Sequence, residues 1–195
     1  MQTRDLRVLF LDIDGVLNSR HWFTTRPAWE TFEGEYSFWH YNLSPLLVGR
    51  LNTIIEHTGA QVVISSNWRR GLSLSDLRAV LQTRGFRGRI LGKTGVDTQE
   101  ERWREISDWL RAQPVPPVAF VVLDDEPLPQ EAQRFFVRTD SAVGLSDDDV
   151  ARAIALLRSA SPSEEGLAPG SGATPGVPTI AGEASTQSQV TTPHG

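Results

Sequence analysis

The sequence predicts a single α/β domain in which helices cover both faces of a parallel β-sheet. Short apolar segments alternate with amphipathic segments along residues 5–158, and this pattern is typical of strands that alternate with helices. The clearest apolar segments are continuous, as in strands that are buried on both faces of a sheet. Right-handed crossovers between such strands produce a parallel sheet between two helical layers.

Five short segments are predicted as strands from their apolar runs. Val8–Leu11 and Val118–Leu123 consist entirely of apolar residues, so both should be buried. In chain order, the five predicted strands are Val8–Leu11, Gln61–Ser65, Arg89–Leu91, Val118–Leu123 and Phe135–Arg138.

Four amphipathic segments are predicted as helices from their start signals and their apolar faces. A serine precedes three of them, as expected of an N-cap residue, and Gly59 ends the first. A threonine and a glutamate three residues apart, as in a capping box, precede the fourth. The start signals are Ser44 with Pro45, Ser73, Thr98 with Glu101, and Ser146.

The composition excludes several functions. The chain has 195 residues and no cysteine, so disulfides, a disulfide-linked partner, thiolate nucleophiles and thiolate metal sites are excluded. The net charge of −5 provides no general attraction to nucleic acid or anionic membranes. Five arginines could still form a local basic patch. They are Arg69, Arg70, Arg84, Arg87 and Arg89.

The two ends of the chain carry no membrane signal. The first apolar run is too short for a signal peptide and breaks at Asp12, and no stretch is long enough to span a membrane. A cytoplasmic location is therefore the expectation. Residues 160–195 are rich in Gly, Pro, Ser, Thr and Ala and contain no Lys or Arg. They are predicted to be a disordered tail, and residues 1–159 are predicted to be the folded domain.

An aromatic segment interrupts the pattern after the first strand. Residues 21–42 contain eight of the chain's sixteen aromatic residues, and residues 19–43 are predicted to form a short cap or flap. The aromatic rings could stack on nucleic-acid bases. We favour the alternative that they pack on the protein itself, because aromatic residues dominate the packing of short irregular segments.

Acidic residues follow the two most apolar predicted strands. Asp12 and Asp14 come directly after the first strand, and Asp124 and Asp125 come after the fourth. In an open parallel sheet, ligands bind beyond the carboxyl ends of the strands, near the point where the strand order reverses. Two acidic loops at this edge can converge on Mg²⁺, which prefers oxygen ligands and keeps water and substrate phosphate in its coordination shell.

Other residues near these strand ends suit phosphate binding. Ser65 and Ser66 end a strand, where hydroxyl and backbone N–H groups can hold a phosphoryl oxygen, and we expect Ser66 and the adjacent Asn67 to contact substrate. Gly15 allows the backbone to turn close to a substrate. A cation is also needed to neutralise the phosphate and the carboxylates, and the candidates are Arg102, Arg104 and Lys93.

Together these segments resemble the haloacid dehalogenase-like (HAD) superfamily of phosphotransferases. The four segments that carry the resemblance, in order, are "LFLDIDGVLN", "VVISSNWR", "RWREISDWL" and "FVVLDDE". The resemblance covers about Leu6 to Leu157 and implies a Rossmann-like three-layer fold with a small cap after the first strand. Within it, "DGVLN", "SSNWR" and "VRTDSAVGLSDDDVARAI" look like the HAD domains of some RNA-repair proteins.

The resemblance also implies a role for each site residue. Asp12 would be the nucleophile that forms an aspartyl-phosphate. Asp14 would protonate the leaving oxygen, then activate water, and bind Mg²⁺ through its backbone carbonyl. The remaining roles are phosphoryl binding by Ser65, a cation at Arg102 in place of the family's usual lysine, and Mg²⁺ binding by Asp12, Asp124 and Asp125, the last directly or through water.

The function that follows is a Mg²⁺-dependent phosphatase with a phosphorylated small molecule, nucleotide or nucleic-acid end as substrate. The dehalogenating members of the superfamily lack an acid at the position of Asp14, so its presence favours phosphoryl chemistry. The alternative is a catalytically retired HAD-like module that binds metal or phosphate. All the acids that catalysis requires are present, which disfavours this alternative.

Overall fold

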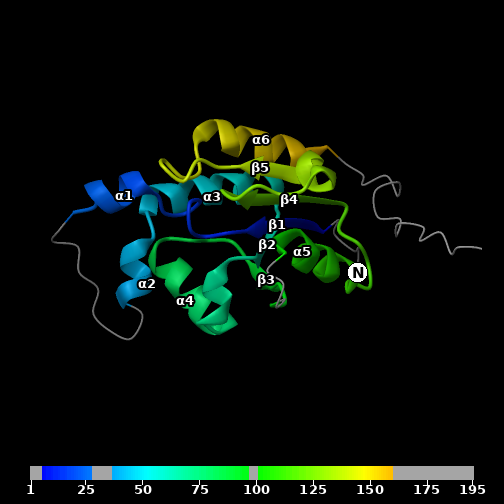
Figure 1. Ribbon diagram of the computed structural model, residues 1–195, viewed down its shortest axis with the longest axis horizontal. Coiled ribbons are helices and arrows are strands. Elements are labelled where there is room, and N and C mark those ends of the chain that lie inside the picture. The colour runs from blue at the N-terminus through cyan, green and yellow to red at the C-terminus, as the bar shows by residue number, and fades with distance from the viewer. Residues whose placement is uncertain (1–5, 28–36, 97–100, 160–195) are drawn as a thin grey trace, which may run out of the picture.

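The computed structural model describes residues 6–27, 37–96 and 101–159. They contain a five-stranded sheet in the order β3-β2-β1-β4-β5, and all neighbouring strands are parallel (Figure 1). The predicted α/β fold with a parallel central sheet is therefore confirmed. Each strand overlaps its predicted apolar run, and β3 extends two residues beyond it. The strands are β1 Arg7–Leu11, β2 Gln61–Ile64, β3 Ile90–Lys93, β4 Ala119–Asp124 and β5 Phe136–Arg138.

Helices lie on both faces of the sheet, as in a Rossmann-like three-layer fold. Figure 1 shows α3 Pro45–Thr58 and α6 Asp147–Arg158 on one side of the sheet and α5 Arg102–Arg111 on the other. The remaining helices are α1 Arg20–Thr25, α2 Ser37–Asn42, α4 Leu74–Thr83, and the short 3-10 helices η1 Asn67–Arg70 and η2 Gln130–Phe135. None of the described helices combines the length and apolar character needed to cross a bilayer.

The alternation of side chains along β1 divides the core into two clusters. Leu9 and Leu11 pack with α3, α4 and α6, whereas Val8 and Phe10 pack with α5 and η2. All four side chains are fully buried, because successive residues of a strand point to opposite faces. The continuous apolar run of β1 thus reflects burial on both faces.

The predicted helix starts differ in outcome. Ser73 and Ser146 each form a capping box, with Asp76 and Asp149 respectively. Ser44 precedes α3, but its side chain makes no cap hydrogen bond. Gly59 ends α3 in the left-handed conformation, as predicted.

The predicted capping box at Thr98 and Glu101 is wrong. Glu101 is itself the N-cap residue of α5 and has extended backbone angles, so it cannot occupy the third helical position. Thr98 lies outside the described residues. The spacing matched a capping box by chance, and the helix begins later, at Arg102.

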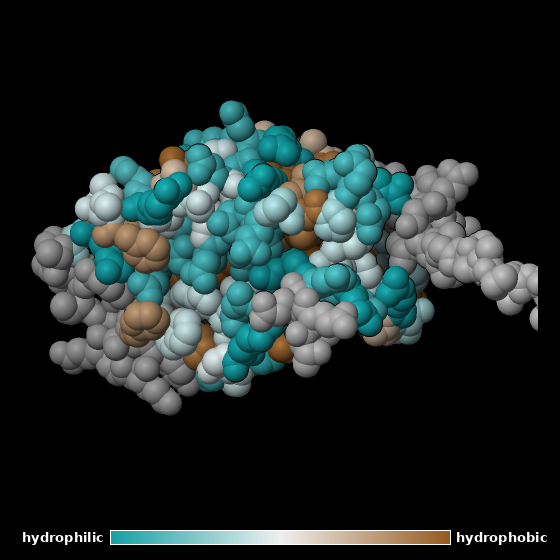
Figure 2. All heavy atoms as spheres, in the orientation of Figure 1, coloured by the Kyte–Doolittle hydropathy of each residue, from teal (hydrophilic) through white to brown (hydrophobic). Residues whose placement is uncertain are grey.

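The structure describes only part of the predicted cap and none of the predicted tail. The predicted cap region contains α1 and α2, while residues 28–36, like the predicted tail at residues 160–195, lie outside the described residues. Hydrophilic residues cover most of the described part of the face in Figure 2. The proposed basic patch loses Arg69 and Arg84, because both side chains are buried.

The register of the sheet places the ends of three strands at one level. Leu11 of β1 pairs with Ile64 of β2 and with Leu123 of β4. The next residues, Asp12, Ser65 and Asp124, are therefore neighbours at the carboxyl edge. The strand order reverses between β1 and β4, so this edge is a topological switch point, where ligands bind in open α/β sheets.

Ser73 and Ser44 both precede helices, but only Ser73 makes a cap hydrogen bond, so alanine variants at the two positions test the contribution of capping. The Ser73→Ala variant should lose about 1 kcal/mol of unfolding free energy, because it removes the hydrogen bond to the backbone N–H of Asp76. The Ser44→Ala variant should lose less, because the Ser44 side chain makes no cap hydrogen bond. Urea denaturation measures both values, and an equal loss in the two variants would contradict the assignment of the caps.

Candidate active site

Three carboxylates crowd together at the switch point. One oxygen from each of Asp12, Asp124 and Asp125 lies within 4.8 Å of the others, and among the described residues this acidic triad is the group that could hold a metal ion. Asp12 follows β1, Asp124 ends β4 and Asp125 follows it. Asp12 is 6% exposed and Asp124 is fully buried. The convergence predicted for the two acidic loops is therefore observed.

Burial sets the electrostatics of the triad. It raises the pKa of Asp12 to about 7, and the nearby Asp124 adds to this increase, while Arg102 and a hydrogen bond from Ser66 oppose it. Burial likewise raises the pKa of Asp124 to about 6, against the lowering effect of Arg102. Burial also raises the pKa of Asp125. The protein thus holds these carboxylates in surroundings that disfavour their negative charge.

The triad fits a divalent cation with oxygen ligands. The Oδ2 atom of Asp124 is buried and makes no hydrogen bond within the described residues. A buried carboxylate oxygen that accepts no hydrogen bond is costly, and a metal ion would supply the missing ligand contact. Three carboxylates are a hard-oxygen donor set, which suits Mg²⁺ better than softer metals.

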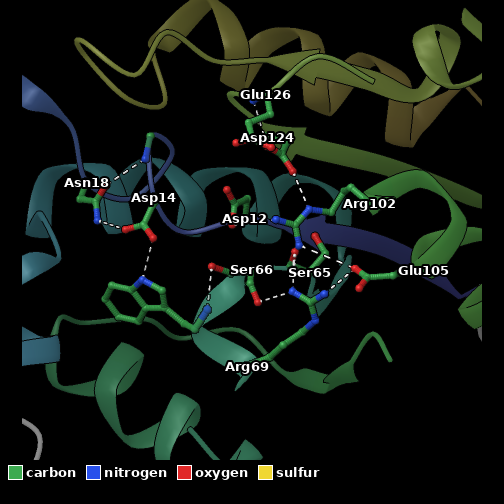
Figure 3. A network of polar contacts seen from close by, with 12 residues as sticks. Asp12, Asp14, Asn18, Ser65, Ser66, Arg69, Arg102, Glu105, Asp124 and Glu126 are labelled. Atoms are coloured by element: carbon green, nitrogen blue, oxygen red, sulfur yellow. Dashed lines mark hydrogen bonds and ion pairs between the residues drawn. The ribbon is translucent and has the colours of Figure 1, made fainter. Parts of the chain in front are cut away.

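Asp14 lies beside the triad, and its side chain has different partners. Its Oδ1 accepts a hydrogen bond from Asn18 Nδ2 at 2.7 Å, and its Oδ2 accepts one from Trp68 Nε1 at 2.9 Å. Figure 3 shows Asp14 directed toward Asn18 and away from Asp124. The side chain is exposed to solvent, so it can exchange protons with water. The predicted contact of its backbone carbonyl with Mg²⁺ stays a prediction.

Gly15 is required by both its conformation and its surroundings. Its φ angle is +71°, and a Cβ atom at this position would lie 2.4 Å from the carboxyl carbon of Asp125. Its N–H donates to Asn18 Oδ1, and its carbonyl accepts from Thr139 Oγ1, both at 2.9 Å. The absence of a side chain therefore allows the loop after β1 to lie against Asp125.

The serines after β2 differ in their available hydroxyl groups. Ser65 Oγ is buried and makes no hydrogen bond within the described residues. Ser66 Oγ accepts a long hydrogen bond from Trp68 N at 3.4 Å. Asn67 begins η1 and is exposed. Of the two hydroxyls, that of Ser65 has the greater capacity for a ligand, and substrate contacts by Ser66 and Asn67 stay predictions.

Of the candidate cations, Arg102 contacts the triad. Its Nε lies 3.1 Å from Asp124 Oδ2, and its Nη2 lies 3.8 Å from Asp12 Oδ1. The nearer contact is an ion pair without hydrogen-bond geometry, since both atoms lack a hydrogen-bond partner. Lys93 instead donates to the carbonyls of Arg69 and Leu72. Arg104 is exposed.

A second buried ion pair supports this arginine, and sequence reasoning missed it. Glu105 bonds to Arg69 Nη2 and lies 3.9 Å from Arg102 Nη1 (Figure 3). Arg69 in turn donates to the carbonyl of Ser66 at 2.6 Å. It therefore connects the serine loop, which is Ser65 and Ser66 after β2, to α5. Burial lowers the pKa of Arg69. Arg69 and Glu105 are 36 residues apart in sequence, and no local motif connects them.

These features define a Rossmann-like α/β domain with an acidic cluster at its topological switch point. The family model for the HAD domain in Swiss Army Knife RNA repair proteins matches residues 8–150. Because this match covers well over half of the chain, the chain belongs to that family of HAD domains, and the resemblance inferred from its motifs is confirmed. Comparison with curated proteins and comparison with solved structures each gave no match.

The raised pKa of Asp12 makes stability depend on pH. Asp12 has a pKa of about 7 in the folded protein and about 3.8 when unfolded, so the folded state binds more protons between these values. The stability of the metal-free protein should therefore fall as the pH rises from about 4 to 7. Asp12→Asn should remove this contribution, raising unfolding free energy by about 1–3 kcal/mol at pH 8 and by little at pH 4.

Chemical denaturation at the two pH values, in the presence of EDTA, checks this prediction. Arg102 keeps its contacts with Asp124 and Glu105 in the variant, so no buried cation is left unpaired. Asp148→Asn, at an exposed position in the first turn of α6, serves as the control and should not raise stability at pH 8, because its carboxylate is favoured at a helix N-terminus. Destabilisation by Asp12→Asn at pH 8 would contradict the electrostatic account.

Gly15 and Gly59 have similar backbone angles. Alanine variants at the two positions therefore distinguish the cost of backbone strain from the effect of displacing Asp125. Gly59 has φ +68° and open space around its Cβ position, whereas Gly15 combines φ +71° with the contact to Asp125. Alanine at either position should cost about 1–2 kcal/mol of stability. Only Gly15→Ala should also weaken Mg²⁺ binding, by tenfold or more as judged by calorimetric titration. Unchanged Mg²⁺ affinity in Gly15→Ala would contradict the assignment of Asp125 to the metal site.

Proposed function

We propose that this domain is a Mg²⁺-dependent phosphoric monoester hydrolase that uses Asp12 as its nucleophile. The observation that carries the proposal is the position of the Asp12 carboxylate, which lies among the acidic triad, Arg102 and the unpartnered hydroxyl of Ser65. A carboxylate, a cation and free hydrogen-bond donors at one strand edge are the parts that phosphoryl transfer requires. Membership of a HAD family supports the same reaction class.

The reaction divides into two displacements at phosphorus. In the first, an Asp12 oxygen attacks phosphorus, the ester P–O bond breaks, and Asp14 donates a proton to the leaving oxygen. In the second, Asp14 takes a proton from water as the water attacks the aspartyl-phosphate. The bond between phosphorus and Asp12 then breaks, releasing inorganic phosphate and the free carboxylate. Covalent catalysis of this kind replaces one difficult step with two easier ones.

Asp12, Asp124, Asp125 and the backbone carbonyl of Asp14 would hold the metal. When bound, Mg²⁺ screens the repulsion between carboxylate and phosphate and stabilises the charge that develops on the phosphoryl oxygens. Ser65 donates its hydroxyl hydrogen to one phosphoryl oxygen. Arg102, whose Nε and Nη1 atoms are buried without hydrogen-bond partners among the described residues, supplies the remaining positive charge.

A nucleotide or nucleic-acid end is the substrate class that we favour. The matched family is described by its occurrence in RNA repair proteins, and repair chemistry acts on phosphorylated ends. The chain's net charge of −5 and the burial of Arg69 and Arg84 disfavour extended contacts along a polynucleotide, which depend on many basic residues. These features favour a substrate recognised at its terminal phosphate.

The proposed reaction is tested with para-nitrophenyl phosphate, with and without Mg²⁺. Wild-type turnover should require Mg²⁺, and Asp12→Asn should reduce it on the order of 10³-fold or more, because the nucleophile is lost. Asp148→Asn is the control for a charge change outside the site and should keep wild-type turnover. Nucleotides and oligonucleotides with 3′- or 5′-phosphate ends then test the substrate class.

Two outcomes would contradict the proposal. Equal turnover in wild type and Asp12→Asn would exclude Asp12 as nucleophile. Mg²⁺ binding without turnover of any phosphate ester in this panel would favour the alternative, a catalytically retired module that retains its metal site.

A further inference from the structure

Asp14 is held by two side chains that have no role in the proposed reaction. Its Oδ2 accepts from the indole Nε1 of Trp68 at 2.9 Å, and its Oδ1 accepts from Asn18 Nδ2 at 2.7 Å. An indole N–H can only donate. The orientation of the Asn18 amide follows from its other hydrogen bond, since its Oδ1 accepts from the backbone N–H of Gly15. Both oxygens of Asp14 are thus fixed by donors.

Trp68 is itself positioned by the aromatic insertion. The Trp68 side chain is 6% exposed and belongs to η1, directly after the serine loop. The ring of Trp39, from α2 of the insertion, lies against it with the ring centroids 4.7 Å apart and the planes at 62°. The described residues therefore contain a continuous path of contacts from the insertion through Trp39 and Trp68 to Asp14.

We propose that Trp68 is a positioning residue for Asp14, and that the insertion sets the position of Trp68 through Trp39. This inference rests on the proposed function, in which Asp14 transfers protons to the leaving oxygen and from water. Asp14 is exposed, so without these donors its side chain would sample several rotamers in solvent. Misplacement of a catalytic group by about 1 Å can reduce a rate by 10²-fold.

The position of a general acid is most important for a poor leaving group. Phenoxide needs protonation as its bond to phosphorus breaks, whereas para-nitrophenoxide is stable as an anion and needs little. Loss of correct positioning at Asp14 should therefore reduce turnover of phenyl phosphate far more than turnover of para-nitrophenyl phosphate. A purely structural role of Trp68 would reduce both rates by the same factor.

The test compares kcat and KM for the two esters in Trp68→Phe, which keeps an aromatic ring but removes the N–H donor. We expect kcat for phenyl phosphate to fall 10- to 100-fold with KM within about threefold of wild type. The fall for para-nitrophenyl phosphate should be at least fivefold smaller, and the thermal midpoint should stay near the wild-type value. Trp109→Phe, in the core cluster on the other face of the sheet, is the control and should not change the ratio of the two rates.

Trp39→Ala tests the second half of the inference, because it keeps the Trp68 donor and removes the ring packed against it. It should change the rate ratio in the same direction, and adding it to Trp68→Phe should cause no further change, as expected for residues that act through one contact. Additive effects would overturn the coupling to the insertion. An unchanged rate ratio in Trp68→Phe would overturn the positioning role.

The Asp12→Asn variant separates this inference from the function on which it rests. If wild-type turnover is present and disappears in Asp12→Asn, the phosphatase proposal stands, and the rate ratio alone decides the role of Trp68. If wild type turns over neither aryl ester nor any nucleotide or oligonucleotide phosphate of the panel, both the proposed function and this inference are overturned.

Discussion

The close approach of two buried carboxylates and a half-buried third is the constraint to which the rest of the site responds. The register of β1 with β4 places Asp12 beside Asp124, and the loop after β4 adds Asp125 within 4.8 Å. Burial and mutual repulsion raise the pKa of Asp12 to about 7. Placing these carboxylates together lowers the free energy of unfolding of the metal-free protein, so stability alone does not account for the arrangement. The arrangement is consistent with a binding site that a cation completes.

Two arginines and a glutamate provide the internal compensation. Arg102 lies against Asp12 and Asp124, and Glu105 lies between Arg102 and the buried Arg69. Since Arg69 also donates to the carbonyls of Ser65 and Ser66, the same network supports the loop whose hydroxyl we assign to phosphate binding. Opposite charges alternate through this cluster, and the loss of Glu105 would leave the buried Arg69 without its carboxylate partner.

Much of this arrangement could be predicted because it depends on local patterns. Apolar runs indicated the strands, and the acids that follow Leu11 and Leu123 indicated the edge at which they meet. A chance match to a local pattern produced one error, since Thr98 and Glu101 have capping-box spacing but Glu101 is the N-cap. Of the five arginines left open as a local basic patch, Arg69 and Arg84 are buried. The contacts of Glu105 with Arg69 and of Trp68 with Asp14 join residues 36 and 54 positions apart. No sequence spacing could indicate them, because they depend on how η1 packs against α5 and against the loop after β1 in the folded protein.

The covalent step at Asp12 is the central claim, and mass spectrometry of acid-quenched reactions tests it most directly. Wild type or Asp14→Asn is mixed with Mg²⁺ and para-nitrophenyl phosphate, quenched within the first turnovers, digested and sequenced. The account predicts that the peptide containing Asp12 gains the mass of one phosphoryl group at that residue, with more accumulating in Asp14→Asn because hydrolysis of the intermediate lacks its base. Turnover with no phosphoryl group on Asp12, or with one on a different residue, would contradict the account.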